Sequence, residues 1–448
     1  MTYQEALQYL NSLENYENNT NYAYENLQLE RVETLLEKLD NPQHKFKSIH
    51  IAGTKGKGST CAYIFSILKE AGYKVGLYTS PHLIDFKERI KISYQDEMEE
   101  AKGRLIEQHE LVQLVEEIKP LAEKIPGLTF FEVVTVIAFL FFARKNMDFV
   151  VLETGLGGRL DATNVVRPLV CGLTNISLDH TALLGNTVEK IAREKAGIIK
   201  KNGLVVTVSQ VPQAWKEIND VCKKKNARLY EIGKDFIFDV IGHNLDGSIF
   251  DFRGIFDSYQ NLHIPLIGQF QLTNAALALG IIHVLRLHDI VISSYAVKKG
   301  LEKTHWPGRM HLIHRNPFFV LDGAQNPDSA HALRAAINML FIPRKSILVL
   351  GVSNDKDVEG ICRHLARQQN LIILTESNSP RALNVDALEK RMPEYQRVIK
   401  KTKRVYDALK MAVENISSRD DLVIVAGSLY LVGEAYTVLK EMRIPDFE

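Results

Sequence analysis

Short, almost wholly apolar segments alternate with segments of helical periodicity along most of the chain. The first is "SIHIAG", which is followed by a helical pattern over residues 59–71 and then by "KVGLYTS". A second series consists of an apolar helix, "FVVLETG", "LVCGLTNIS", a helix near residues 187–196 and "GLVVTVS". Because these apolar segments do not alternate strictly, they predict strands that are buried on both faces of a parallel sheet. The pattern therefore predicts an α/β fold.

A break in this pattern near residue 305 indicates two domains. Before it, the alternation around "LDG" predicts a hairpin, and "THWPGRM", with its Pro-Gly pair, is the best candidate for a linker. Beyond it, "FFVLDGA", "SILVLGVS", "LIILTES" and "LVIVAGS" restart the alternation of strands and helices. We therefore expect a larger α/β domain over residues 1–304 and a smaller, Rossmann-like α/β domain over residues 305–448.

The composition removes several classes of protein. With a formal net charge of +1, the chain offers no overall electrostatic attraction for nucleic acid or an anionic membrane. Its four cysteines have no C-x-x-C spacing, which argues against a disulfide framework or a zinc site and is typical of a reducing compartment. The acidic, polar N-terminus lacks the features of a secretory signal, so we expect a cytoplasmic location.

One apolar segment, "VVTVIAFLFFA", has the composition of a membrane span but about half the length that a bilayer requires. Thr129 stands just before this segment, and Glu132 follows Thr129 by three positions, which is the spacing of a capping box at the start of a helix. The segment is therefore predicted to be a buried helix of a soluble domain.

The segment "GTKGKGST", residues 53–60, lies between the first predicted strand and the helix that follows it. Its glycines can adopt positive φ, so that backbone N–H groups close around an anion at the start of the helix. Lys57 supplies a charge for phosphate, and the hydroxyl of Ser59 or Thr60 can reach a magnesium ion. Gly58 interrupts the pattern G-x-x-x-x-G-K-[ST], so a glycine-rich turn with solvated lysines is the alternative. The position between strand and helix favours phosphate binding and a P-loop NTPase-like, mostly parallel sheet domain.

Polar residues follow three more predicted strands of this domain. Ser80 ends "GLYTS", Glu153 follows "FVVL", and His180 follows "GLTNISLD". The carboxyl ends of parallel strands form the edge where such sheets bind ligands, and these side chains there could hold Mg²⁺ beside a triphosphate. Taken singly, each residue is better explained as a helix cap, a salt-bridge partner or a core histidine, whereas together they predict a magnesium site.

Lys195 lies on the apolar stripe of the helix near residues 187–196 rather than on its charged face. An inward-facing lysine loses its hydration, so it should be paired, neutral or chemically modified. The alternative is a side chain that extends along the helix to reach solvent at the helix end. The residue pattern leaves these two interpretations equally open.

In this order, the segments resemble the motifs of the folylpolyglutamate synthase and dihydrofolate synthase family within the Mur ligase superfamily. The similarity covers nearly the whole chain and is carried by "GTKGKGST", "YTSPHL", "FFEVVTVIAF", "ETGLGGRLDATN", "ISLDH", "REKAGI", "GQFQLTNAALAL", "WPGRM" and "LDGAQNPDSA". Gly58 distinguishes this family's loop from that of its cell-wall relatives. The resemblance implies an ATP-dependent ligase that joins L-glutamate to the carboxylate of dihydropteroate or folate through an acyl phosphate.

The resemblance also implies roles for individual residues. Magnesium, at two sites, would be held by Ser80, Glu153, His180 and a carbamate on Lys195. The catalytic groups implied are Lys57, Lys195, His180 and Arg309. Contacts with ATP are implied for Gly53, Thr54, Lys55, Gly56, Lys57, Gly58, Ser59, Thr60, Asn274, Arg309 and Asp322. Contacts with the pterin are implied for His82 and Asp161, and with the incoming amino acid for Ser428.

One position departs from the family pattern D-G-A-H-N-P, because Gln325 replaces the histidine. Glutamine keeps hydrogen-bonding capacity but cannot be protonated, so an orienting role survives there and an acid–base role does not. We expect a monomer whose partners are the pterin or folate substrate and L-glutamate, with no nucleic acid and no membrane.

Three other functions are compatible with parts of the sequence. A cell-wall ligase that adds amino acids to a UDP-sugar peptide would share the domains, but Gly58 and "SPHL" argue against it. A P-loop kinase would leave a phosphorylated small acceptor as its final product. A nucleotide-binding regulatory protein would hydrolyse ATP slowly, with no dependence on an amino acid.

Overall fold

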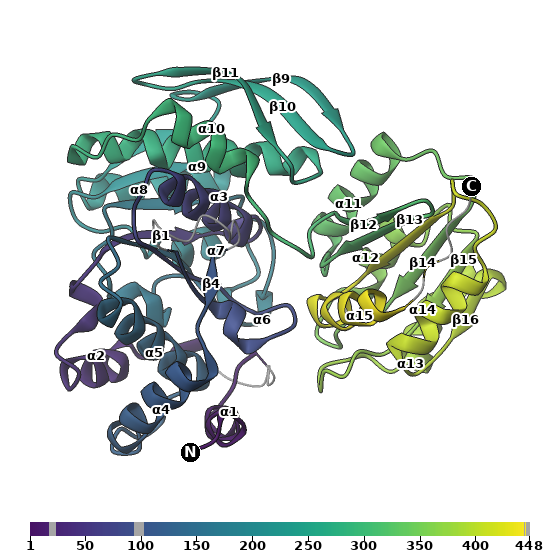
Figure 1. The fold of residues 1–448 in the computed structure, drawn as a ribbon, viewed down its shortest axis with the longest axis horizontal. Helices are drawn as coiled ribbons and strands as arrows, with labels where there is room; N and C mark the ends of the chain where they lie inside the picture. The colour runs from purple at the N-terminus through teal and green to yellow at the C-terminus, as the bar shows by residue number, and fades with distance from the viewer. Residues whose placement is uncertain (18–23, 94–102, 443, 445–448) are drawn as a thin grey trace. The chain divides into compact units, whose positions relative to one another are not determined.

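The computed structural model describes residues 1–17, 24–93, 103–442 and 444, and the chain divides into two compact units (Figure 1). The first unit comprises Met1–Gly242, Ser248–Pro265 and Phe270–His305. The second comprises His243–Gly247, Leu266–Gln269 and Trp306–Glu448. Each unit has its own large sheet, in which most neighbouring strands are parallel. The predicted α/β fold class is therefore confirmed.

The first unit is built on an eight-stranded sheet in the order β4-β3-β2-β5-β1-β6-β7-β8. Its strands are β1 (Lys47–Ala52), β2 (Val75–Tyr78), β3 (Ile90–Ser93), β4 (Arg104–Leu105), β5 (Phe149–Glu153), β6 (Val170–Leu173), β7 (Leu204–Thr207) and β8 (Arg228–Glu231). From β2 to β8 all pairs are parallel, whereas β3 and β4 add antiparallel pairs at one edge. The central strands β2, β5, β6 and β7 are buried along their whole length, as their continuous apolar segments predict.

Helices cover both faces of this sheet (Figure 1). They are α1 (Tyr3–Ser12), α2 (Leu29–Glu37), α3 (Lys57–Glu70), α4 (Gln108–Ala122), α5 (Phe130–Arg144), α6 (Thr181–Leu184), α7 (Val188–Ala196), α8 (Pro212–Lys224), α9 (Gln269–Leu285) and α10 (Ser294–Glu302). A Cβ at Gly172 of β6 would touch Ile51 of β1 and Ile281 of α9, so these residues share one face. Side chains alternate along a strand, so His50 and Ala52 lie on the other face, where α5 and α7 pack.

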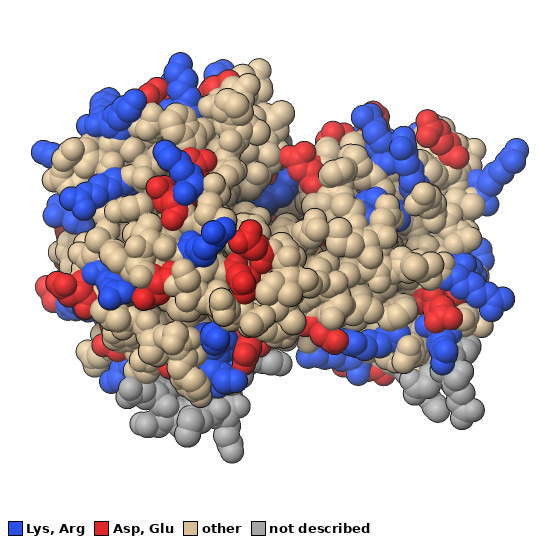
Figure 2. All heavy atoms as spheres, turned by 90° about the horizontal axis from the view of Figure 1, so that it is seen from above, with Lys and Arg blue, Asp and Glu red and all other residues tan. Residues whose placement is uncertain are grey.

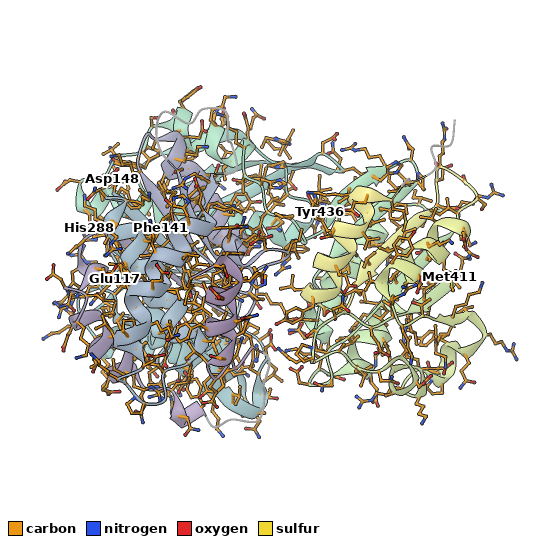
Figure 3. The ribbon with its side chains drawn as sticks, turned by 60° about the horizontal axis from the view of Figure 1, so that its bottom comes forward. Glu117, Phe141, Asp148, His288, Met411 and Tyr436 are labelled. Atoms are coloured by element: carbon orange, nitrogen blue, oxygen red, sulfur yellow. The ribbon has the colours of Figure 1, made fainter. Side chains whose placement is uncertain are left out.

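Helix α5 contains the apolar segment whose composition is that of a membrane span. The Thr129 hydroxyl accepts a hydrogen bond from the backbone of Glu132, whose carboxylate accepts one from the backbone of Thr129. This is the predicted capping box. At its other end, Arg144 forms an ion pair with Glu117 of α4, and Figure 3 labels Glu117 together with Phe141 of α5. The helix belongs to the core of the unit.

Helix α9 and the three residues after it form one helical stretch, Gln269–His288, that is long and apolar enough to cross a membrane by length and composition alone. However, 78% of its most apolar window is buried inside the protein, as in the core helix of a globular unit. On the face that Figure 2 shows, basic and acidic side chains are interspersed, in keeping with the formal net charge of +1.

A separate three-stranded sheet and the second unit complete the described structure. The small sheet contains β9 (Ile237–Asn244), β10 (Gly247–Arg253) and β11 (Ser258–Ile264), with the predicted hairpin between β9 and β10. The sheet of the second unit contains β12 (His311–Arg315), β13 (Phe318–Asp322), β14 (Ser346–Leu350), β15 (Leu371–Leu374), β16 (Ile399–Lys401) and β17 (Leu422–Ala426), in the order β12-β13-β17-β14-β15-β16. Its helices are α11 (Pro327–Leu340), α12 (Val358–Leu365), α13 (Val385–Lys390), α14 (Val405–Glu414) and α15 (Leu429–Glu441). All strand pairs except β12 with β13 are parallel.

Candidate active site

The loop between β1 and α3 has the backbone of an anion-binding turn. Gly53 has φ of 150°, and Gly56, which caps α3, has φ of 89°. A Cβ at Gly53 would lie 1.7 Å from Oγ1 of Thr174, and one at Gly56 would lie 2.1 Å from Oδ1 of Asn274. Only glycine fits both positions without a shift of its neighbours. The N–H groups of the first turn of α3, which have no acceptor within the helix, face this loop.

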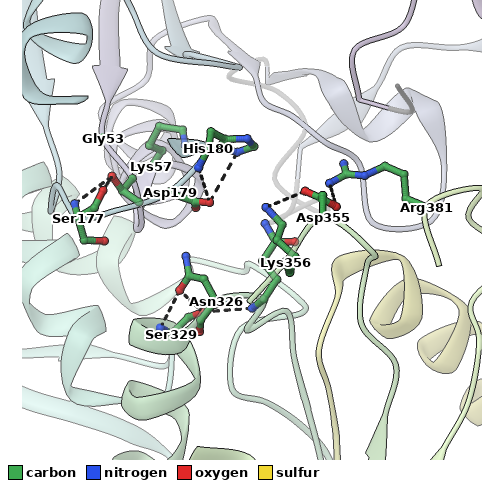
Figure 4. Close-up of polar contacts among 12 residues, drawn as sticks. Gly53, Lys57, Ser177, Asp179, His180, Asn326, Ser329, Asp355, Lys356 and Arg381 are labelled. Atoms are coloured by element: carbon green, nitrogen blue, oxygen red, sulfur yellow. Dashed lines mark hydrogen bonds and ion pairs between the residues drawn. The ribbon is translucent and has the colours of Figure 1, made fainter. Parts of the chain in front are cut away.

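The loop after β6 holds the phosphate loop in place (Figure 4). The backbone N–H of Thr54 donates to the carbonyl of Asn175 at 2.8 Å. The Thr54 hydroxyl donates to the carbonyl of Ser177 and accepts from its backbone N–H, both at 3.1 Å. Lys55 forms an antiparallel bridge with Asn175. The phosphate loop is thereby joined to the segment that leads to His180.

Three residues predicted from the sequence meet at the carboxyl ends of β1, β2 and β5. The Nζ atom of Lys57 lies 3.8 Å from Oε1 of Glu153, and Oε2 of Glu153 accepts a hydrogen bond from the backbone N–H of Ser80 at 3.3 Å. The side chains of Lys57 and Glu153 are only 16% and 7% exposed. Solvent therefore screens their charges weakly, and each charge interacts strongly with neighbouring charged groups.

Lys195 of α7 is buried against the phosphate loop, with 5% of its surface exposed. Its Nζ atom donates a hydrogen bond to the carbonyl oxygen of Gly53 at 2.8 Å. Burial, with the charge of Lys57 adding to it, lowers the pKa of Lys195 to about 7. The side chain thus points inward rather than along the helix to solvent, and at neutral pH a large fraction of it is an uncharged amine.

Asp179 and His180 follow the loop that holds Thr54. His180 is the N-cap residue of α6 and has a left-handed backbone, with φ of 49°. Its Nε2 lies 4.0 Å from Oδ1 of Asp179 (Figure 4). The charge of Asp179 acts on the pKa of Lys195 in the opposite sense to burial. The structure thus places the charge of Asp179, for which the sequence predicted no role, near the buried amine.

The residues at this edge fit a magnesium ion that takes most of its ligands from water and phosphate. Within the described residues, no group of three or more His, Cys, Asp or Glu side chains could hold a metal by itself. The hydroxyl groups of Thr60, Thr154 and Ser177 are buried without a hydrogen-bond partner in the described parts of the chain. Mg²⁺ commonly uses one or two carboxylates and keeps several waters, so Glu153 and nearby hydroxyls form a suitable donor set.

The predicted pterin contacts lie on the loops that follow β5 and β2. Asp161 is 3% exposed and accepts hydrogen bonds from the backbone of Leu156 at 2.8 Å and of Thr163 at 3.1 Å. Burial raises the pKa of Asp161. Nδ1 of His82 accepts a hydrogen bond from Nε of Arg89 at 2.9 Å, and burial, with the Arg89 charge, lowers the pKa of His82 to about 4. Both side chains are therefore held by the protein itself.

In the second unit, Asp322 ends β13 and accepts hydrogen bonds from the backbone of Met310 at 2.7 Å and of Ala324 at 2.8 Å. Burial raises the pKa of Asp322, against the charge of Arg309. Ser428 caps α15 by accepting a hydrogen bond from a backbone N–H of its first turn. Gln325, the residue that departs from the family pattern, donates its backbone N–H to the side chain of a serine in α11.

A charged cluster that the sequence did not single out follows β14 and β15. Oδ1 of Asp355 lies 2.5 Å from Nη2 of Arg381, and its Oδ2 lies 3.5 Å from Nζ of Lys356 (Figure 4). Although burial favours the neutral acid, the Arg381 hydrogen bond and the Lys356 charge hold the pKa of Asp355 below its usual range. The available signal was the charged segment "NDKD", which begins four residues after the buried strand β14.

Two family models match most of the chain. Residues 51–282 match the Mur ligase middle domain, and residues 308–429 match the Mur ligase glutamate ligase domain. The chain is 34% identical over 421 residues to the dihydrofolate synthase/folylpolyglutamate synthase of Bacillus subtilis, covering 92% of this chain and 95% of that protein. It is 32% identical over 413 residues to the folylpolyglutamate synthase of Lacticaseibacillus casei, covering 90% and 92%.

Solved structures share the fold. The folylpolyglutamate synthase of Thermotoga maritima matches with a TM-score of 0.83 and 35% identity, over 99% of this chain and 98% of that one. The FolC protein of Escherichia coli in complex with DHPP and ADP matches with a TM-score of 0.84 and 30% identity, over 98% of each chain. The similarity thus extends over nearly the full length of each protein.

The substitution Gly56→Ala should weaken ADP binding by about tenfold or more. The new Cβ would collide with Asn274 and would strain a residue whose φ is 89°. Isothermal titration with ADP measures the change. Gly242→Ala is the matched control, because nothing lies within 4 Å of a Cβ there. An ADP affinity that is the same in both variants would contradict a nucleotide site at this loop.

Proposed function

Because the chain belongs to the folylpolyglutamate synthase and dihydrofolate synthase family of Mur ligases, it is an ATP-dependent ligase, and we propose that it joins L-glutamate to the carboxylate of dihydropteroate, folate or both. The proposal is supported by the contacts that join Lys57, Glu153 and Ser80 beside the phosphate loop. The buried Lys195 is hydrogen-bonded to the same loop. The relative from Escherichia coli has been solved with DHPP and ADP, and the one from Mycobacterium tuberculosis with ADP and AMPPCP.

The proposed reaction has two steps. First, a carboxylate oxygen of the pterin substrate bonds to the γ-phosphorus of ATP, and the bond from that phosphorus to the β–γ bridging oxygen breaks, giving an acyl phosphate and ADP. Then the α-amine of glutamate bonds to the acyl carbon, phosphate leaves, and the nitrogen loses a proton. Lys57 and the first-turn N–H groups of α3 stabilise the negative charge of the transferred phosphoryl group.

A magnesium ion bound at Glu153 and Ser80 would supply further positive charge to the phosphates. The Glu153 carboxylate is held at the sheet edge by the backbone N–H of Ser80 and by the charge of Lys57. For the remaining family positions, the roles stay predictions from the resemblance. These are the metal-ligand role of His180, the nucleotide contacts of Asn274, Arg309 and Asp322, and the pterin contacts of His82 and Asp161.

Lys195 is proposed to carry a carbamate. The nitrogen of its uncharged amine would bond to the carbon of CO₂, and the π electrons of one C=O bond would move to its oxygen, which gives a carboxylate. The nitrogen would then release a proton. The product places an anion near Lys57, so that the two side chains attract each other, whereas a protonated Lys195 would be repelled by Lys57. The carbamate could then hold water or a second magnesium ion beside the phosphates.

The substitution Lys195→Ala should lower the turnover number severely, by a factor of about one hundred or more, because the anion at the phosphate loop is lost. Steady-state assays with ATP, glutamate and the pterin acid measure this loss. Lys190→Ala, an exposed lysine on the same helix, is the control and should keep the parental rate. Activity of Lys195→Ala within about twofold of the parent would reject the role.

The activation by CO₂ should also depend on pH. At a fixed CO₂ pressure, forming the carbamate releases one proton from the neutral amine and two from the ammonium. The ratio of carbamate to free lysine should therefore rise about tenfold per pH unit well above pH 7 and fall about hundredfold per unit well below it. CO₂-depleted enzyme that is restored equally at pH 6 and pH 8 would be inconsistent with an amine of this pKa.

The charged cluster of the second unit is proposed as the site of the incoming glutamate. Lys356 and Arg381 outweigh the single charge of Asp355, so the cluster is cationic and suits a dicarboxylate. Arg381 also interacts with Tyr430, two residues after Ser428, which brings the predicted Ser428 to the same sheet edge. Asp355 would then meet the amino group of the amino acid.

The substitution Lys356→Ala should raise the KM for glutamate about tenfold and leave the KM for ATP within about twofold, because a carboxylate partner is lost and the phosphate loop is untouched. Initial rates with one substrate varied at a time measure both constants. Lys401→Ala removes an exposed, ion-paired lysine of β16 and serves as the control. Equal rises in both constants would argue against a glutamate site here.

The function as a whole is tested by following ADP release with purified protein, magnesium and ATP. Release should require both a pterin or folate carboxylate and glutamate, and labelled glutamate should appear in an amide product. A phosphorylated acceptor as the final product would indicate a kinase instead. ATP hydrolysis without need of glutamate would indicate a regulatory nucleotide-binding protein.

A further inference from the structure

The loop between β2 and β3, which carries His82, is closed by hydrogen bonds of its own. The backbone N–H of Thr79 donates to the carbonyl of Arg89 at 3.1 Å and joins the two ends of the loop. The carboxylate of Glu88 accepts from three successive backbone N–H groups, those of Leu83, Ile84 and Asp85. The loop therefore holds His82 in a defined position before any ligand binds.

Arg89 is buried inside this loop, with a side chain that is 1% exposed. Its two terminal nitrogens donate to both carboxylate oxygens of Glu17 at 2.8 and 2.5 Å, and its Nε donates to Nδ1 of His82 at 2.9 Å. The guanidinium also lies 5.8 Å and 5.3 Å from the ring centres of Phe86 and Phe130. A buried guanidinium is costly unless it is paired and bonded, so these contacts are what make its position stable.

Glu17 fixes the direction in which the guanidinium points. It lies in the N-terminal segment after α1, and this segment is attached to the unit where the backbone of Phe130 donates to the carbonyl of Glu14 at 2.9 Å. A bidentate pair between a planar guanidinium and a carboxylate leaves little freedom of rotation. With Glu17 bound at its two ends, Arg89 can aim Nε at only one place, which is the His82 ring.

This contact determines where the hydrogen of the His82 ring is placed. Arginine only donates hydrogen bonds, so Nδ1 of His82 must accept and cannot carry a hydrogen. A neutral imidazole has a single N–H group, which is therefore at Nε2. Among the residues that the structure describes, Nε2 of His82 has no hydrogen-bond partner, and it is not a buried atom.

We propose that Arg89 is a positioning residue that fixes His82 as the Nε2–H tautomer, so that His82 donates a hydrogen bond to the pterin ring. The inference rests on the proposed function, because it specifies how His82 would recognise that substrate. The atom recognised is an acceptor, either a carbonyl oxygen or an unprotonated ring nitrogen, and a pterin ring has both. A ring that presents an N–H group at the same point would leave two donors facing each other and would bind more weakly.

Arg89→Lys is the first test, because lysine keeps a positive charge for Glu17 but lacks the planar fork that also reaches His82. The KM for the pterin substrate should rise about tenfold, while the turnover number and the KM for ATP stay within about twofold. Arg31→Lys is the matched control, since Arg31 forms a partly buried ion pair with Glu132 in the same unit. It should leave every KM unchanged, and an equal rise in both variants would overturn the inference.

A double-mutant cycle separates action through His82 from a general structural effect. In a His82→Gln background, Arg89→Lys should cause no further rise in the KM for the pterin substrate. Independent, additive effects of the two substitutions would overturn the inference.

The tautomer can be read in the unchanged protein, so the test does not depend on any variant folding. Long-range ¹H–¹⁵N spectra of histidine-labelled protein, assigned by the signals missing from His82→Gln, should show a hydrogen on Nε2 of His82 and none on Nδ1. A hydrogen on Nδ1 would overturn the inference. If the parent itself releases no ADP with a pterin acid and glutamate, the proposed function fails; an active parent with the wrong tautomer overturns only the assignment of Arg89.

Discussion

The hydrogen bond from Nζ of Lys195 to the carbonyl oxygen of Gly53 is the contact on which the arrangement of the site depends. It joins α7 to the first residue of the phosphate loop, at a point where Thr174 leaves no room for a side chain. A buried ammonium would lose its hydration and would face the charge of Lys57, and both effects keep the pKa of Lys195 near 7. The position therefore favours a neutral amine that is held against the loop and is able to react with CO₂.

In both units, polar residues of the proposed sites lie at or after the carboxyl end of a buried strand. Glu153 ends a buried strand of the first sheet, and Asp355 and Lys356 follow a buried strand of the second. Parallel strands bring such residues to one edge, so side chains distant in the sequence become neighbours without any long loop. The phosphate chemistry proposed for the first edge and the amino acid proposed for the second follow from the charges that each edge gathers.

Elements that depend on residues a few positions apart could be predicted from the sequence. The capping box of Thr129 and Glu132 could be predicted because residues three positions apart determine it. The pattern also placed Lys195 on the apolar stripe of its helix, but it left open whether the side chain is buried or extends to solvent. The edge strands β3 and β4 and the contact of Arg89 with Glu17 could not be predicted, because the pairing partner is not local. Arg89 and Glu17 are 72 positions apart, and in the sequence Arg89 looks like one more charged residue of a polar loop. The pair of Asp355 with Arg381 could not be predicted either, because these residues are 26 positions apart.

The proposed role of Lys195 requires that its amine forms a carbamate at the phosphate loop. The most direct measurement is a ¹³C NMR spectrum of the protein equilibrated with ¹³C-labelled bicarbonate above pH 7, compared with that of Lys195→Ala. We expect a carbamate carbon signal in the parent that is missing from the variant. Spectra that are identical for the two proteins at saturating bicarbonate would contradict this role.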